Sequence, residues 1–248
     1  MEKLDDLKRR LISVKNMGFV RTHRVHDTGI GKTLEDLLGV AENNMRLPDV
    51  GDVELKAKRI SSGSMLTLAT KSPLPRGVNR VLFDRYRYLD DSGHHCLHST
   101  VYGSRPNKQG FRIVPTHDRL ILENPQNVTA YWLSSVFEET LKSKSDRILL
   151  VLAETKGRRK SADEHFHFTE AYLLSNLNEA KFLSAIANDK LKVDIRIGLF
   201  RSGAREGQYH DHGTGFRIGK LDFLQIYDSY EPVISGSTHL LGGFPEVK

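Results

Sequence analysis

The longest purely apolar run in the chain, ILLVLA at residues 148–153, is the feature that most constrains the fold. A membrane-spanning helix needs about 20 apolar residues, and this run is far shorter. Apolar side chains on both faces are typical of a central strand that is covered on both sides. We therefore expect a layered sheet at this point of the chain and no membrane partner.

Helical and extended patterns alternate around this run. Apolar residues recur with helical spacing over residues 4–14, and a second helix is expected to start at Thr33, whose spacing to Asp36 matches a capping box. From Asp52 the period changes to two, which indicates a strand with a charged face. Further strands are expected at 65–70, 96–102, 112–122, 146–154 and 193–199, mainly helix at 171–191, and either state at 81–88. The order predicts a mixed α/β fold.

Composition narrows the class of protein. With 38% apolar and 27% charged residues, the 248-residue chain has a globular composition, which excludes a disordered or fibrous protein. A single cysteine, Cys96, cannot form an intramolecular disulfide, and residues 1–10 lack the apolar core of a signal peptide, so we expect a cytoplasmic protein. The 37 Lys and Arg against 31 Asp and Glu give a net charge of +6, which favours a polyanionic partner.

The most informative segment is PDVGDVELK at residues 48–56. On a strand, Glu54 and Lys56 project from the same face, and Asp49 in the preceding bend can reach the same point. Two carboxylates can bind Mg²⁺, which prefers oxygen ligands, and the lysine can orient an attacking water and stabilise charge on a phosphate. Asp52 is a rival to Asp49, and Glu35, early in the second expected helix, could add a further carboxylate.

Other segments allow more than one interpretation. Gly31-Lys32-Thr33 has the ending of a P-loop, but that motif needs a glycine five residues before Gly31, where the chain has His26, so no nucleotide cofactor is expected. The His94-His95-Cys96-Leu97-His98 segment is too crowded for converging zinc ligands, which favours a non-metal role. The basic stretch 156–163 could separate two lobes or form a solvated turn.

Several motifs together resemble the MvaI/BcnI family of restriction endonucleases, relatives of the mismatch-repair nickase MutH. The motifs, in chain order, are TGIGKTLEDLL, PDVGDVELK, LTLATKSP, AETKGRR, FHFTEAYLL, VDIRIG and HDHGTGFRI. They cover most of the chain, and their order and length make them far more specific than the short PD…ELK pattern alone. The resemblance implies a PD-(D/E)XK restriction-endonuclease-like fold with a central mixed sheet flanked by helices, in a MutH-like two-lobed arrangement.

The resemblance also implies site residues. Asp49, Glu54 and Lys56 match the catalytic signature, Glu35 matches a helix glutamate, and the Leu55 carbonyl would join Asp49 and Glu54 as a Mg²⁺ ligand. The turn His210-Asp211-His212 matches a major-groove reading loop, and imidazole N–H groups and a carboxylate can distinguish G·C pairs. Further expected DNA contacts are Arg217, Arg196, Lys71, Lys32 and His98.

The implied activity is that of a monomeric bacterial or archaeal type II endonuclease. It would cut both strands of double-stranded DNA at a short CC-N-GG-like site with Mg²⁺, leaving 5′-phosphate and 3′-hydroxyl. Residues 1–155 are expected to form a catalytic lobe and residues 156–248 a DNA-recognition lobe. Two alternatives stay open: a MutH-like strand-specific nickase, and a non-catalytic DNA-binding module.

Overall fold

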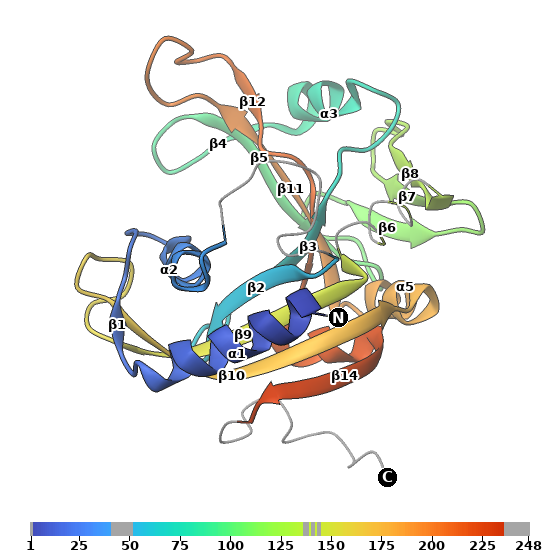
Figure 1. Cartoon of the computed structure of the whole chain (residues 1–248). Helices are drawn as coiled ribbons and strands as arrows, with labels where there is room; N and C mark the ends of the chain where they lie inside the picture. The colour runs from blue at the N-terminus through green and yellow to red at the C-terminus, as the bar shows by residue number, and fades with distance from the viewer. Residues whose placement is uncertain (1, 41–51, 136–138, 140–141, 143–144, 236–248) are drawn as a thin grey trace. The chain divides into compact units, whose positions relative to one another are not determined.

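The computed structural model describes residues 2–40, 52–135, 139, 142 and 145–235 (Figure 1). The chain divides into two compact units, which are described separately. Unit 1 comprises residues 1–64, 142–177 and 227–248, and unit 2 comprises residues 65–141 and 178–226. The boundary expected between residues 155 and 156 differs from this division. It falls within β9 (Arg147–Lys156), which forms a long antiparallel pair with β10 (His165–Leu177) inside unit 1.

Unit 1 is built on a five-stranded mixed sheet. Its order is β1 (Val20–Arg21), β10 (His165–Leu177), β9 (Arg147–Lys156) and β2 (Glu54–Arg59), with β14 (Tyr227–Ile234) also paired to β10. β2 runs parallel to β9, and the other pairs are antiparallel. The apolar run lies in β9, where residues 148–153 are all buried, which confirms the expected central strand.

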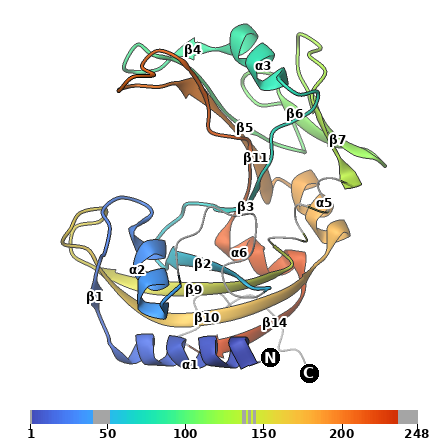
Figure 2. The same ribbon diagram turned by 45° about the horizontal axis from the view of Figure 1, so that its top comes forward.

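Two helices cover one face of this sheet. They are α1 (Glu2–Asn16) and α2 (Gly29–Leu38), and Figure 2 shows α1 along β10 and α2 beside β2. Leu11 and Leu34 pack with Leu55 and Leu149 in one core cluster. Because strand side chains alternate, Glu54 and Lys56 project from the opposite face of β2.

Unit 2 contains a six-stranded antiparallel sheet and a smaller three-stranded one. The larger sheet has the order β3 (Leu66–Thr70), β13 (Gly215–Ile218), β11 (Leu191–Leu199), β5 (His95–Val101) and β4 (Tyr88–Leu89), with β12 (Tyr209–Asp211) also paired to β11. The smaller sheet comprises β6 (Arg112–Pro115), β7 (Arg119–Glu123) and β8 (Tyr131–Leu133). Its helical elements include α3 (Val78–Tyr86), α5 (Glu179–Ala187), α6 (Lys220–Phe223) and the 3-10 turn η1 (Leu224–Ile226).

The prediction of helix across residues 171–191 is wrong in its first part. β10 continues to Leu177, and α5 begins only after Asn178, whose side chain caps it by accepting from the Lys181 N–H at 3.0 Å. Residues 171–174 are all buried, so both faces of the strand are apolar and the alternation that identifies a strand is missing.

The start predicted for the second helix is also wrong. α2 begins at Gly29 with Thr28 as its N-cap, so Thr33 lies within the helix. The Thr33 hydroxyl donates to the Gly29 carbonyl at 2.8 Å and accepts the His23 N–H at 2.9 Å. A side chain at Gly29 would meet the Arg24 carbonyl, so glycine permits the chain to enter the helix this closely.

Residues 81–88, which allowed either state, are mainly helical, and residues 112–122 form two strands of a hairpin instead of one. Among the described residues, no helix has the length and apolar character needed to cross a membrane.

Candidate functional site

The centre of the predicted catalytic motif is a close pair of side chains on β2. The Lys56 Nζ donates to Glu54 Oε1 at 2.6 Å, with exposed side-chain fractions of 24% for Lys56 and 12% for Glu54. Among the described strands, β2 is the last in the unit 1 sheet, and its parallel partner β9 places Ile148 and Leu150 beside the two residues. The structure thus holds a carboxylate and an ammonium together at an accessible point of a rigid sheet.

Charge near this pair affects a buried tyrosine. Burial raises the pKa of Tyr227 well above its usual value, and the charges of Asp146 and Glu54 raise it further. Tyr227 therefore stays protonated, and its hydroxyl donates to the Ser145 carbonyl at 2.7 Å. This bond fixes the chain where β9 begins, directly beside β2.

The two candidate aspartates differ in what the structure says of them. Asp49 lies outside the described residues, so its position relative to Glu54 stays a prediction. Asp52 is described, and its exposed carboxylate forms an ion pair with Arg147. This ion pair is the first cause that holds the pKa of Asp52 below its usual value.

Glu35 is placed by α2, which packs against β2. It is half-buried, and its carboxylate lies near Gly31 one helical turn earlier. The structure thus places Glu35 on a helix that contacts β2, and its membership of one site with Glu54 and Lys56 stays a prediction.

The oxygen groups at this site fit a hard divalent cation. The Glu54 carboxylate is held but still partly accessible, and the Leu55 carbonyl follows it on the strand. Carboxylate and carbonyl oxygens are ligands that Mg²⁺ accepts. Within the part of the chain that the structure describes, no group of three or more His, Cys, Asp or Glu converges as a metal site, and that part excludes Asp49.

A second set of predicted residues gathers on one face of the unit 2 sheet. His98 on β5 lies opposite Arg196 on β11, and His210 on β12 lies opposite Gly198. The His210 and His212 rings are 3.9 Å apart. Burial lowers the pKa of His212, and His210, His98 and Arg196 lower it further. We call His98, Arg196, His210 and His212 the histidine face.

Arg196 supports the turn that carries two of these histidines. Its guanidinium donates to the carbonyls of Gly213, at 3.2 Å, and His212, at 3.4 Å. Because a guanidinium is a rigid planar donor, these two bonds fix the turn against β11. The structure thus gives Arg196 a supporting role alongside any contact with DNA.

Asp211 points away from its two histidine neighbours. Its carboxylate accepts from the Asn79 side chain on α3 at 2.7 Å and from the Gly213 N–H at 2.7 Å. Strand alternation explains the separation, because consecutive side chains leave opposite faces. The predicted trio is therefore divided between the two sides of β12.

The other predicted DNA contacts have different surroundings. Arg217 forms an ion pair with the buried Asp194, and Lys32 pairs with Asp36 at 2.8 Å. The hydrogen bonds from Lys32 and His23 lower the pKa of Asp36. Lys71 is half-exposed, and its ammonium has no hydrogen bond or ion pair to any other described residue.

A buried ion pair in unit 1 was missed by the sequence reading. Arg59, at the end of β2, binds both oxygens of Glu164 at 2.7 and 2.8 Å, with exposed side-chain fractions of 5% and 1%. Arg59 also donates to the carbonyls of His26 and Asp27, which precede α2. The two partners lie 105 residues apart, so no local pattern could have identified them.

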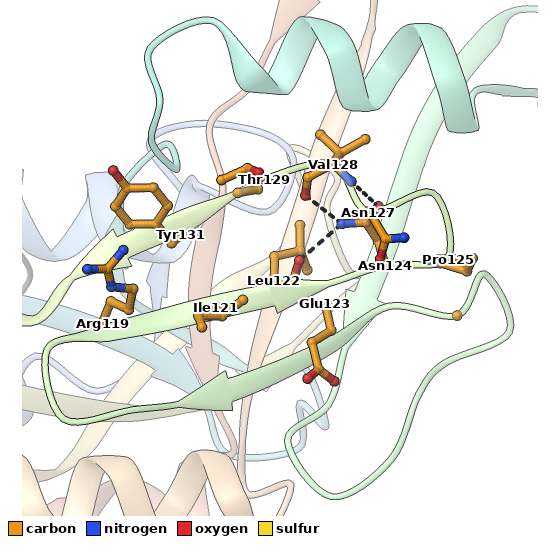
Figure 3. Close-up of a pocket in the computed structure, with 12 residues that line it drawn as sticks. Arg119, Ile121, Leu122, Glu123, Asn124, Pro125, Asn127, Val128, Thr129 and Tyr131 are labelled. Carbon is orange, nitrogen blue, oxygen red and sulfur yellow. Dashed lines mark hydrogen bonds between the residues drawn. The ribbon is translucent and has the colours of Figure 1, made fainter.

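Unit 2 also has a pocket on β7 and the loop that follows it (Figure 3). The Asn124 side chain holds this loop, donating to the carbonyls of Leu122 at 3.1 Å and Val128 at 2.7 Å. Arg119 lies over the Tyr131 ring at 4.9 Å from its centre. None of the predicted site residues lines this pocket, so it carries no part of the predicted chemistry.

Comparisons with known proteins identify the family to which the chain is similar. The sequence profile of the MvaI/BcnI restriction endonuclease family matches residues 8–227. The structure is similar to two solved structures: restriction endonuclease MvaI in a cognate DNA substrate complex (TM-score 0.82, covering 94% of this chain and 99% of that one), and MvaI in the absence of DNA (TM-score 0.56, covering 94% and 98%). The identity is 35% in both. A search of the curated proteins gave no match.

Fold and comparisons together define a type II site-specific deoxyribonuclease with a PD-(D/E)XK-type fold. More particularly, the chain belongs to the MvaI/BcnI restriction endonuclease family, because the family profile spans most of its length. The resemblance noted from the sequence motifs is thereby confirmed, as is the mixed α/β fold class. An interpretation as a non-catalytic binding module is set aside.

Proposed function

We propose that the protein cuts both strands of double-stranded DNA at a short CC-N-GG-like site by Mg²⁺-dependent hydrolysis, leaving 5′-phosphate and 3′-hydroxyl ends. The observation that carries the proposal is the 2.6 Å contact between Lys56 and Glu54 on β2, at the motif that matches the family. Solved MvaI in complex with cognate DNA supports double-stranded DNA as the partner.

Glu54, Asp49 and the Leu55 carbonyl would hold the Mg²⁺. When bound, the metal lowers the pKa of a water ligand and neutralises charge on the phosphoryl oxygens. Lys56 has three N–H donors, and the bond to Glu54 uses one of them. The remaining two can orient the attacking water and bind an oxygen of the scissile phosphate.

The reaction forms a bond between phosphorus and the water oxygen and breaks the bond from phosphorus to the 3′ oxygen. The 3′ oxygen takes up a proton, which accounts for the proposed products. Glu35, on the helix beside β2, would support the carboxylate site. A monomer has one such site, so it would cut the two strands in separate events and release a nicked intermediate.

Base reading is proposed for the histidine face of unit 2. Imidazole N–H groups of His210 and His212 can donate to guanine O6 or N7 in the major groove. Asp211, held by Asn79 and Gly213, would present its remaining lone pairs to a cytosine amino group or shape the turn. Arg217, Lys71 and His98 in unit 2 are proposed to contact DNA, as is Lys32 in unit 1. A cytoplasmic location suits the buried free thiol of Cys96.

The site assignment is tested by four variants assayed on plasmid DNA. We expect Glu54→Gln, Lys56→Met and Asp49→Asn each to reduce the cleavage rate by about 10²- to 10³-fold or more while leaving DNA binding largely intact. Asp52→Asn is the matched control, because Asp52 is on the same segment but is paired with Arg147. Full activity in Lys56→Met would overturn the assignment, and loss in Asp52→Asn with activity kept in Asp49→Asn would transfer the metal role to Asp52.

The same assay separates the strand-specific nickase from the proposed endonuclease. A nick that converts with time to a double-strand break supports the proposal. A product that remains nicked on one strand at every enzyme concentration would contradict it.

A further inference from the structure

A continuous stack of flat groups runs along the β11–β12 hairpin beside the histidine face. Phe200 directly follows β11 and is locked into the hairpin, because its N–H donates to the Gln208 carbonyl at 2.9 Å and its carbonyl accepts from Gly207 at 2.8 Å. Its ring lies parallel to the His210 ring, with 4.0 Å between centres and 6° between planes. The Arg205 guanidinium carbon lies 4.1 Å from the centre of the Phe200 ring.

The phenyl ring is covered on both sides. Two planar groups, each about 4 Å from the same ring centre, cannot share one face without overlapping, so Arg205 and His210 must lie on opposite faces of Phe200. The stack continues from His210 to His212, whose ring is tilted by 47°. A loop cation, an aromatic ring and two imidazoles thus form one ordered column.

This column limits how His210 can turn. The hydrogen-bonding nitrogens of imidazole lie in the ring plane, so the plane of the ring sets where its N–H can donate. A ring held flat against Phe200 has its donor direction set before DNA binds. Holding a group in its bound orientation avoids the entropy loss of ordering it during binding.

We propose that Phe200 is a positioning residue for base discrimination: together with Arg205, it fixes the plane of His210. The inference rests on the proposed reading role of His210. It assigns Phe200 no contact with DNA and no part in bond cleavage.

Unit 1 contains the same three kinds of side chain, but they do not form a parallel stack. Lys156 lies 4.0 Å from the centre of the Phe19 ring, and Phe19 lies 5.3 Å from the His167 ring at 57°. These residues repeat the combination of cation, phenylalanine and histidine, but the rings are not parallel. Phe19→Leu is therefore the control for the general cost of losing a half-buried phenyl ring.

The experiment measures cleavage rates on the cognate site and on every site that differs by one base pair. Phe200→Leu keeps an apolar side chain of similar bulk but removes the flat face. We expect it to reduce discrimination about tenfold at the base pair that His210 reads, within the range found for single base contacts, with a smaller change at the cognate site. Phe200→Tyr keeps the flat ring and should discriminate as well as the unmodified protein. Arg205→Gln changes an exposed loop and should reduce discrimination at the same base pair by a smaller factor.

Two further arms separate this inference from the function on which it rests. If His210→Ala leaves discrimination unchanged, the reading role itself fails. If His210→Ala removes discrimination at one base pair but Phe200→Leu and Arg205→Gln do not, the positioning role alone fails. Adding Phe200→Leu to His210→Ala should produce no further loss, and an equal loss in Phe19→Leu would contradict the proposal.

Discussion

The two units assemble their proposed functional residues in different ways. In unit 1, Glu54 and Lys56 come from one strand, two residues apart, and meet at 2.6 Å. In unit 2, the histidine face collects its members from β5, β11, β12 and the turn after β12. The first arrangement needs only strand alternation, whereas the second depends on the register of three strands. A short stretch of sequence is therefore enough to place Glu54 and Lys56 together, whereas the arrangement of the histidine face depends on how three strands pair.

The interactions that hold the two sites in place differ as well. Unit 1 fixes the end of β2 with the buried pair of Arg59 and Glu164. Unit 2 holds the β12 turn with hydrogen bonds from Asn79 and Arg196. A buried ion pair that loses one partner leaves an unpaired buried charge, which lowers the free energy of unfolding more than the loss of one hydrogen bond does. Breaking these supports should therefore affect the units unequally.

The largest effect is expected for Arg59→Met. It leaves Glu164 buried without its partner, so the free energy of unfolding should fall by about 3–5 kcal/mol. Denaturant unfolding measures the loss, and amide hydrogen exchange should show it first in unit 1. Lys8→Met, which removes an exposed ion pair with Glu231 in the same unit, is the control and should change stability by about 0–1 kcal/mol.

Acid should weaken the same pair. Burial alone would raise the pKa of Glu164, but hydrogen bonds from Arg59 and from the Lys160 N–H outweigh it and hold the pKa below the usual 4.5. A carboxyl whose pKa is lower in the folded state stabilises the protein above its unfolded pKa, and this contribution is lost as pH falls through the folded value. The stability advantage over Glu164→Gln should thus be constant near neutral pH, begin to decline near pH 4.5 and be lost as the pH falls through the lower folded-state pKa, as followed by unfolding at a series of pH values.

Asn79→Ala should have an intermediate effect on unit 2. It removes a charge-assisted hydrogen bond to Asp211, so we expect a loss of about 1.5–3 kcal/mol in local stability. Faster hydrogen exchange in β12 and α3, with unit 1 unchanged, would support the comparison. Equal changes in both units would show that the supports are not separate.

The smallest effect is expected for Asp36→Asn. Asp36 pairs with Lys32 and His23 on the surface of α2, and exposed pairs contribute about 0–1 kcal/mol. Thermal unfolding should barely change. A loss comparable to that of Arg59→Met would mean that the segment before α2 depends on this surface network.

Much of unit 1 could be predicted from the sequence because its signals are local. The run at 148–153 identified the central strand, and the i, i+2 spacing of Glu54 and Lys56 placed both on one face. The helix predicted across β10 was wrong because residues 171–174 are apolar on both faces, which removes the period of two. Strand pairing, which no local pattern contains, decided that segment.

In unit 2, several contacts of the site could not be predicted from local sequence patterns. The motif HDHGTGFRI was interpreted as presenting His210, Asp211 and His212 as one reading group, which overlooked the alternation that directs Asp211 toward Asn79. Arg217 is engaged by Asp194, 23 residues earlier, across the β11–β13 pair. Phe200 belongs to none of the sequence motifs, and its proposed role follows from the parallel contact of its ring with His210.

The most direct test of the central claim is to sequence all DNA ends that the purified protein produces. Plasmid and phage DNA are incubated with Mg²⁺ or with EDTA. The account predicts Mg²⁺-dependent ends on both strands at one short CC-N-GG-like motif, with 5′-phosphate on each. Intact DNA that is nevertheless bound in a gel shift, or ends confined to one strand, would contradict it.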